Sequence, residues 1–196
     1  MSDCSPGLVP LRLGFVKAYL LRGTGQSVLI DTGTKGNLPA IAGQLERAGV
    51  GLENVGLIVV THAHSDHIGS LVDVVQATGA KVLAHRLELE RLPAVSDVLV
   101  EDELDLEQYG VRARMISTPG HTRGSLSVIV ESGEAVVGDL VLPRDMAFGP
   151  PAIAFWAASR EDSLASVRKV LALKPSVIHA SHGGPFRPEA LARMAS

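Results

Sequence analysis

Thr61-His62-Ala63-His64-Ser65-Asp66-His67-Ile68-Gly69-Ser70 follows directly on the apolar run Leu57-Ile58-Val59-Val60. The apolar run is short and rich in β-branched residues, which is typical of a buried strand. The polar stretch after it places four candidate metal ligands within six positions. Since residues i and i+2 of an extended segment point the same way, His62 and His64 can bind one metal ion.

The chain is expected to turn after His64, because a helical pattern occupies residues 68–78. Asp66 and His67 lie at this turn, so they can face a second ion. Gly69 leaves space for backbone to come close to the metals. The stretch therefore predicts ligands for two neighbouring ions.

Three more candidate ligands occur later in the chain, each after an apolar, strand-like run. They are His121 in Thr118-Pro119-Gly120-His121, Asp139 in Val136-Val137-Gly138-Asp139, and His182 in Ser181-His182-Gly183. We expect four strands to deliver ligands from their carboxyl ends to one edge of a sheet. Imidazole and carboxylate without thiolate suit Zn²⁺, and also Fe or Mn. Seven ligands are too many for one tetrahedral zinc, so we predict two divalent metal ions, Zn²⁺ before Fe or Mn.

Length and composition set the class of protein. A chain of 196 residues with 46% apolar residues suits a single folded domain, here residues 1–196. A net charge of −3 and 4% aromatic residues leave little for nucleic acid, so no such partner is expected. The single cysteine, Cys4, excludes an internal disulfide framework. With no signal peptide in residues 1–15 and no apolar run of 18 residues, we expect a cytoplasmic protein without membrane contact.

The remaining pattern predicts an α+β fold. Strands are expected at 15–21, 27–30, 57–60, 81–84, 111–117, 126–130, 135–137 and 176–179, and helices at 39–48, 68–78, 86–92 and 163–173. This mixture predicts two packed mixed β-sheets with helices on both outer faces.

Several other polar residues have a structural and a functional interpretation. Asp31 and Thr61 could orient imidazoles, or Asp31 could simply cap a turn. His85 lies outside every ligand pattern, and we predict a structural role for it. His179 competes with His182 as a ligand, but His182 carries the glycine that follows, so His179 is interpreted as a strand-end or supporting residue.

The motif set resembles the metallo-β-lactamase superfamily in its glyoxalase II-like branch. The resemblance extends from Val28-Leu29-Ile30-Asp31-Thr32-Gly33 to His182-Gly183, with Ser181 where glycine is frequent. It implies an αββα sandwich with the metals at one edge. It also implies a first metal held by His62, His64 and His121, a second held by Asp66, His67 and His182, and a bridge formed by Asp139.

Two such metals imply hydrolysis by a metal-bound hydroxide, with Asp66 as the catalytic group that takes up and delivers protons. The predicted enzyme cleaves a small-molecule thioester, ester or lactone. Glyoxalase II proper adds a helical domain that binds glutathione, whereas this chain ends 14 residues after His182, which puts that substrate in doubt. Three alternatives stay open: a mononuclear iron persulfide dioxygenase-like oxidoreductase, a phosphodiesterase or nuclease, and a catalytically idle site that serves binding.

The segment 143–156 begins just after Asp139, so its start is expected near the metals. Phe148 and Trp156 are predicted to form an apolar wall for a substrate, and Arg144 to bind a carboxylate. The alternative is that these aromatic side chains pack over the core or form the contact of a homodimer.

Overall fold

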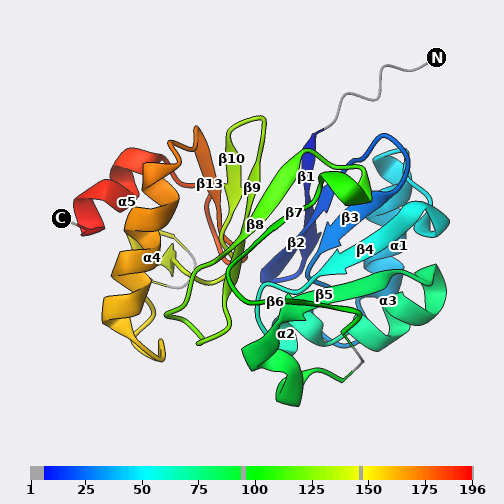
Figure 1. The fold of residues 1–196 in the computed structure, drawn as a ribbon, viewed down its shortest axis with the longest axis horizontal. Coiled ribbons are helices and arrows are strands. Elements are labelled where there is room, and N and C mark those ends of the chain that lie inside the picture. The colour runs from blue at the N-terminus through cyan, green and yellow to red at the C-terminus, as the bar shows by residue number, and fades with distance from the viewer. Residues whose placement is uncertain (1–6, 94–95, 146–147, 196) are drawn as a thin grey trace.

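Two β-sheets face each other at the centre of the molecule, as the ribbon of the computed structural model shows (Figure 1). The structure describes residues 7–93, 96–145 and 148–195. The first sheet has the order β1-β2-β3-β4-β5-β6, antiparallel from β1 to β3 and parallel from β3 to β6. Its strands are β1 (Leu8–Leu13), β2 (Val16–Leu21), β3 (Ser27–Ile30), β4 (Val55–Val59), β5 (Lys81–His85) and β6 (Val98–Val100).

The second sheet has the order β13-β10-β9-β8-β7. Strands β10 and β13 are parallel, and β9 is antiparallel to both β8 and β10, so β8, β10 and β13 run in one direction. Its strands are β7 (Glu103–Asp105), β8 (Ala113–Ser117), β9 (Leu126–Val130), β10 (Glu134–Val136) and β13 (Val177–His179). A separate small pair joins β11 (Leu142–Pro143) and β12 (Pro151–Ala152).

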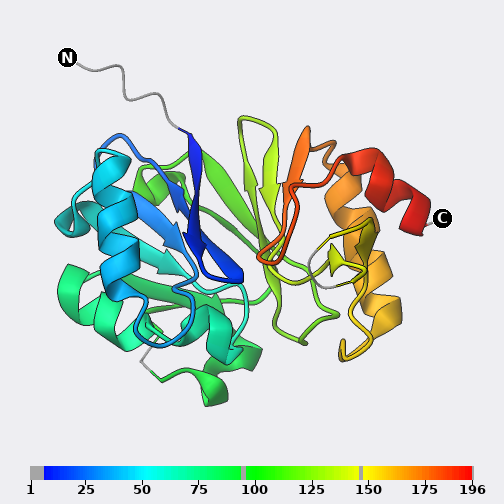
Figure 2. The same ribbon diagram turned by 180° about the vertical axis from the view of Figure 1, so that it is seen from behind.

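Helices cover the outer face of each sheet, as the front and back views both show (Figures 1 and 2). The first sheet carries α1 (Leu38–Arg47) and α3 (Leu71–Thr78), and the second carries α4 (Arg160–Ala172) and α5 (Pro188–Ala195). The shorter helical elements are η1 (Leu52–Asn54), α2 (Ser65–Ile68), η2 (Arg86–Arg91) and η3 (Glu107–Tyr109). Helix α4 begins where the Ser159 hydroxyl accepts a hydrogen bond from the Asp162 N–H, a side-chain cap.

Three apolar clusters fill the spaces between these four layers. In and after β4, Leu57 and Val59 face the second sheet, while Ile58 and Val60 face the other way into the cluster shared with α1 and α3. Because both faces of the strand are buried, its sequence is continuously apolar rather than alternating. The predicted αββα sandwich is confirmed.

Several predicted elements differ from the observed ones. The helix predicted over 68–78 is two helices, α2 and α3, so Asp66 and His67 lie within α2 rather than in a turn before it. Strands β1, β6 and β7 and helix α5 were not predicted. Pro10 made β1 a poor strand candidate, but β1 is the edge of its sheet, where proline is tolerated. The other three elements have only three to eight residues and therefore show little periodicity.

The segment 143–156 includes Pro143 of β11 and the whole of β12, and these two short strands pair with each other. Met146 and Ala147, which belong to that segment, lie outside the described residues. Within the part of the chain that is described, no helix is both long and apolar enough to cross a membrane.

Candidate metal centre

The candidate ligands follow the carboxyl ends of strands from both sheets. His62 follows β4 in the first sheet, and His121, Asp139 and His182 follow β8, β10 and β13 in the second. The prediction that the strands delivering the ligands belong to a single sheet is therefore wrong. The two sheets face each other with these strand ends at a common edge of the sandwich, so their ligands converge from opposite sides.

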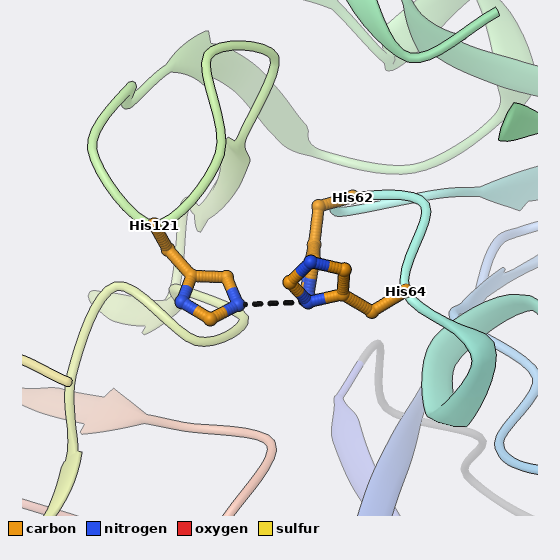
Figure 3. A group of neighbouring side chains, drawn as sticks. All are labelled: His62, His64 and His121. Carbon is orange, nitrogen blue, oxygen red and sulfur yellow. Dashed lines mark hydrogen bonds between the residues drawn. The ribbon is translucent and has the colours of Figure 1, made fainter. Parts of the chain in front are cut away.

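His62, His64 and His121 form the first group, drawn in Figure 3. The Nδ1 atom of His64 lies 3.0 Å from Nε2 of His62 and 3.0 Å from Nε2 of His121. Two nitrogens that bind one tetrahedral zinc at about 2.0–2.1 Å are separated by roughly 3.3 Å. The three imidazoles thus meet at the spacing that a single divalent ion requires.

Asp139 lies between this group and a second one. Its Oδ2 atom is 3.9 Å from Nε2 of His62, 3.6 Å from Nε2 of His121, 3.5 Å from Nε2 of His67 and 3.4 Å from Nε2 of His182. The residue is buried just after the end of β10. A carboxylate in this position can contact ions on both sides.

Asp66, His67 and His182 form the second group. Nε2 of His182 lies 3.1 Å from Oδ2 of Asp66, and Nε2 of His67 lies 3.7 Å from the same oxygen. His67 is fully buried, whereas Asp66 is partly exposed. The second group therefore opens toward solvent on the Asp66 side.

Asp31 fixes the orientation of two imidazoles. Its Oδ2 accepts a hydrogen bond from Nδ1 of His67 at 2.8 Å and another from the Thr61 hydroxyl at 2.7 Å, and its Oδ1 accepts one from the Thr61 N–H. The Thr61 oxygen is also 3.1 Å from Nδ1 of His62. Since the hydroxyl proton is given to Asp31, His62 donates from Nδ1, and Nε2 of both histidines is left to bind a metal.

His182 is oriented in a similar way by the backbone. Its Nδ1 donates to the carbonyl oxygen of Phe15 at 3.1 Å, and the two rings stack at 5.7 Å. Nε2 is thereby directed at Asp66 and Asp139. The partner comes from the segment just before β2, which is 167 positions away in the sequence.

Glu88, on η2, holds the two loops that carry the first group. Its carboxylate accepts hydrogen bonds from the N–H of Ala63, between His62 and His64, and from the N–H of Gly124, beyond His121. It is buried although it carries an ionisable group. Sequence reasoning missed this role, because nothing in the pattern of η2 separates Glu88 from the exposed Glu90.

The two groups differ in their protonation. Burial lowers the pKa of His62 well below its usual value, lowers that of His64, and lowers that of His121 to about 4. Burial acts the same way on His67, but the carboxylates of Asp31 and Asp139 outweigh it and raise its pKa to about 10. The first group is therefore three neutral imidazoles with free nitrogens, as metal ligands must be.

In the second group, the imidazoles of His67 and His182 lie close to the carboxylates of Asp66 and Asp139. Burial is again outweighed at His182, where Asp139 and Asp66 raise the pKa to about 9. The hydrogen bond from His182 holds the pKa of Asp66 below its usual value, and burial of Asp139 is outweighed by the neighbouring His182 and His67, which hold its pKa well below normal.

Two buried polar atoms test whether the site fits a metal. Nε2 of His67 and Oδ1 of Asp139 have no hydrogen-bond partner among the residues that the structure describes. Such buried atoms are costly to leave unpaired. Both belong to the ligand set and their side chains lie beside each other, so divalent cations fit the residues present.

Two glycines near the ligands are required for packing. A Cβ on Gly69 would lie 2.4 Å from the Lys35 nitrogen, so this glycine makes room for backbone, as expected, and that backbone belongs to residues 34–35. Gly138 has φ +55°, and a Cβ there would lie 2.9 Å from the Thr61 hydroxyl. Gly138 therefore lets the Asp139 loop approach the Asp31–Thr61 network.

The two other histidines lie outside the ligand set. Nε2 of His85 donates to the carbonyl oxygen of Glu101 at 2.9 Å, and its Nδ1 accepts from the Leu87 N–H. His179 contacts Glu134 at 3.1 Å. Both positions agree with the structural roles predicted for them.

The predicted substrate contacts are distributed over different parts of the surface. Trp156 lines a cavity of about 590 Å³ that also includes His64 and His121. Phe148 is 79% exposed and lines another cavity, beside Phe15 and Gly183. Arg144 is exposed, and its backbone N–H donates to the Pro150 carbonyl.

Comparison with known proteins agrees with this geometry. The family described as metallo-beta-lactamase superfamily matches residues 11–182. Metallo-beta-lactamase domain-containing protein 1 of Mus musculus is 32% identical over 190 residues, which cover 95% of this chain and 70% of that protein. A hydroxyacylglutathione hydrolase of Cereibacter sphaeroides is 31% identical over 160 residues, 80% of this chain but only 56% of the relative.

Solved structures show the same architecture. A metallo-β-lactamase family protein of Thermus thermophilus has a TM-score of 0.75 at 25% identity, over 96% of this chain and 78% of that one. The BLEG-1 B3 metallo-β-lactamase has a TM-score of 0.77 at 22% identity, over 96% and 98% of the two chains, and shows the fold alone. From the family match and the shared fold, the chain belongs to the metallo-β-lactamase superfamily and is similar to its glyoxalase II members.

Proposed function

We propose that this protein is a metal-dependent hydrolase that binds two divalent ions, Zn²⁺ in preference to Fe or Mn, and cleaves a small thioester, ester or lactone. The observation that carries the proposal is the position of Asp139 between two groups of ligands. His62, His64 and His121 would hold one ion, Asp66, His67 and His182 the other, and Asp139 would bridge them. The similarity to hydroxyacylglutathione hydrolases supports an acyl substrate.

When bound, two such ions would lower the pKa of a water between them and polarise a carbonyl oxygen. The chain's own residues supply the rest. His64 is half-buried and Asp66 is partly exposed, so a substrate can approach both groups from this side. As a metal-bound carboxylate Asp66 would be ionised, and one of its oxygens could accept a proton and return it to the leaving group.

Metal analysis and a substrate panel test this proposal together. Protein purified under mild conditions and supplied with zinc should approach two ions per chain and hydrolyse thioester or lactone reporters. Asp66→Asn should lower turnover by roughly 10²–10⁴-fold, while Asp73→Asn, an exposed carboxylate on α3, should leave it unchanged.

Other results would favour the alternatives. Iron near one per chain with no hydrolysis would support an oxidoreductase, and turnover confined to phosphodiester reporters would support a nuclease. Metal content that stays at or below one after zinc or manganese is supplied would refute the dinuclear centre.

A further inference from the structure

One cavity begins at the first ligand group and is bordered by arginines. Its walls include the ligands His64 and His121, the arginines Arg86, Arg91 and Arg123, and Trp156. Arg86 and Arg91 are the two ends of η2, and Arg123 lies on the His121 loop. The cationic groups therefore come from the two segments that Glu88 ties together.

Two of these arginines are free to bind an anion. Arg86 is paired with Glu101 at 2.6 Å. Arg91 and Arg123 are exposed, and neither forms an ion pair within residues 7–93, 96–145 and 148–195. Of the two glutamates in the cavity wall, Glu88 is committed to backbone N–H groups, so only Glu90 could compete for them. A guanidinium presents a planar fork of donors that matches an oxyanion.

We propose that this cavity binds a carboxylate carried by the substrate, through Arg91 and Arg123, while Trp156 covers the apolar part next to it. The inference rests on the proposed function, because it places the carboxylate beside a scissile acyl group at His64 and His121. It narrows the substrate class to acyl compounds that bear a carboxylate away from the bond that is cleaved. Arg144 does not line this cavity, so we assign the carboxylate contact here to η2 and the His121 loop rather than to Arg144.

Binding in this cavity can be followed directly, because Trp156 is the only tryptophan of the chain. The zinc-loaded protein is titrated with (benzylsulfanyl)acetate, a thioether that cannot be hydrolysed, and with its neutral amide, while Trp156 fluorescence is followed. Benzylphosphonate is the third ligand. The variants are Arg91→Gln and Arg123→Gln, and the control is Arg112→Gln, which removes an exposed arginine paired with Glu131 in a different cavity.

We expect the carboxylate to bind more tightly than its amide and than the phosphonate. Each of the two variants should weaken carboxylate binding by about three- to tenfold, between the effect of an exposed ion pair and that of a charge-assisted hydrogen bond. Binding of the amide should not change, and Arg112→Gln should behave as the wild type.

Carboxylate affinity that is unchanged in both variants but lost on chelation of the metals would place the anion on the metals and overturn the inference. An arginine-dependent preference for the phosphonate would overturn the carboxylate assignment. The probe is not hydrolysed, so this binding test does not depend on activity. If the substrate panel showed no hydrolysis, the binding data could still be interpreted.

Discussion

At the residue scale, Asp31 shows how one buried carboxylate can organise a site that it does not enter. It is 1% exposed, contacts both Thr61 and His67, and has φ +62°, a left-handed conformation that aspartate tolerates better than most residues. Of the two interpretations that the sequence left open, the structure favours the orientation of imidazoles. The turn at the end of β3 is held in this conformation while the carboxylate points at the ligands.

Asp139→Asn tests the bridging role at the same scale. The amide keeps the size of the side chain but removes the negative charge that lies 3.4–3.9 Å from four imidazole nitrogens. Two cations would then repel each other with less charge between them. We expect metal content to fall from two ions to about one per chain. Turnover should fall by about tenfold to a hundredfold.

Elemental analysis and circular dichroism of Asp139→Asn measure metal content and fold separately. Asp162→Asn, which changes an exposed carboxylate on α4, is the matched control. Full occupancy and normal turnover in Asp139→Asn would mean that Asp139 is only a turn residue.

Lys17 gives a pH dependence that can be assigned to one residue. Burial, and then the neighbouring Arg12, lower its pKa from 10.5 to about 8. Between these two values the unfolded chain keeps a proton that the folded chain has released, so folding stability rises with pH across this window. Between pH 8 and pH 10.5, the free energy of unfolding of the wild type should therefore rise with pH relative to that of Lys17→Met.

Urea unfolding of the zinc-loaded proteins at several pH values measures this difference. Lys35→Met, which removes an exposed lysine, should run parallel to the wild type. If Lys17→Met also runs parallel, the amino group of Lys17 titrates at its ordinary pKa in the folded protein.

At the scale of elements, η2 connects ligand loops that belong to different sheets. Residues 61–64 extend from β4, the His121 loop extends from β8, and Glu88 receives a hydrogen bond from each. The short helix thus fixes the distance between the His62–His64 pair and His121. Its two terminal arginines border the same cavity, so its position affects both the metal ligands and access to them.

Glu88→Gln should weaken metal binding without removing a ligand. The amide has only one oxygen to accept a hydrogen bond, and its NH₂ group would face a second backbone N–H. We expect zinc affinity to fall about tenfold to a hundredfold, as for other residues that support metal ligands. Competition with a chromophoric chelator measures the affinity, and Glu90→Gln, an exposed neighbour on η2, is the control. Equal affinities for the two variants would contradict the role of Glu88.

At the scale of the whole molecule, the ligand cluster joins the two halves of the sandwich. The first sheet brings His62, and α2 packed near it brings Asp66 and His67, while the second sheet brings the remaining three segments. Metals held by all of them would cross-link the halves in the folded state only. Ligands that bind the folded state alone stabilise it by mass action.

Removal of the metals should therefore lower the midpoint of thermal unfolding. For ions present at about 100 times their dissociation constant, the gain of about 2.7 kcal/mol corresponds to roughly 5–10 °C in a chain of this size. Calorimetry with and without a chelator measures it, and the chelator already saturated with zinc is the control. An unchanged midpoint after verified loss of metal would show that the packing of the two sheets does not depend on the ions.

The cytoplasmic location and the homodimer stay predictions.

The sequence by itself determined that the fold is a layered α+β sandwich, and it predicted the candidate ligands that the structure brings together. Each ligand follows an apolar run. A run such as Leu57–Val60 can be recognised from the sequence because both faces of the strand are buried, so every residue in it is apolar. The tertiary structure decided how those residues are used. The partners of His67, His182 and the His121 loop are Asp31, Phe15 and Glu88, and strand order and packing bring them there from 36 to 167 positions away. The same packing put Trp156 and Phe148 in different cavities although only eight positions separate them, because Phe148 lies in the turn between β11 and β12 whereas Trp156 follows β12.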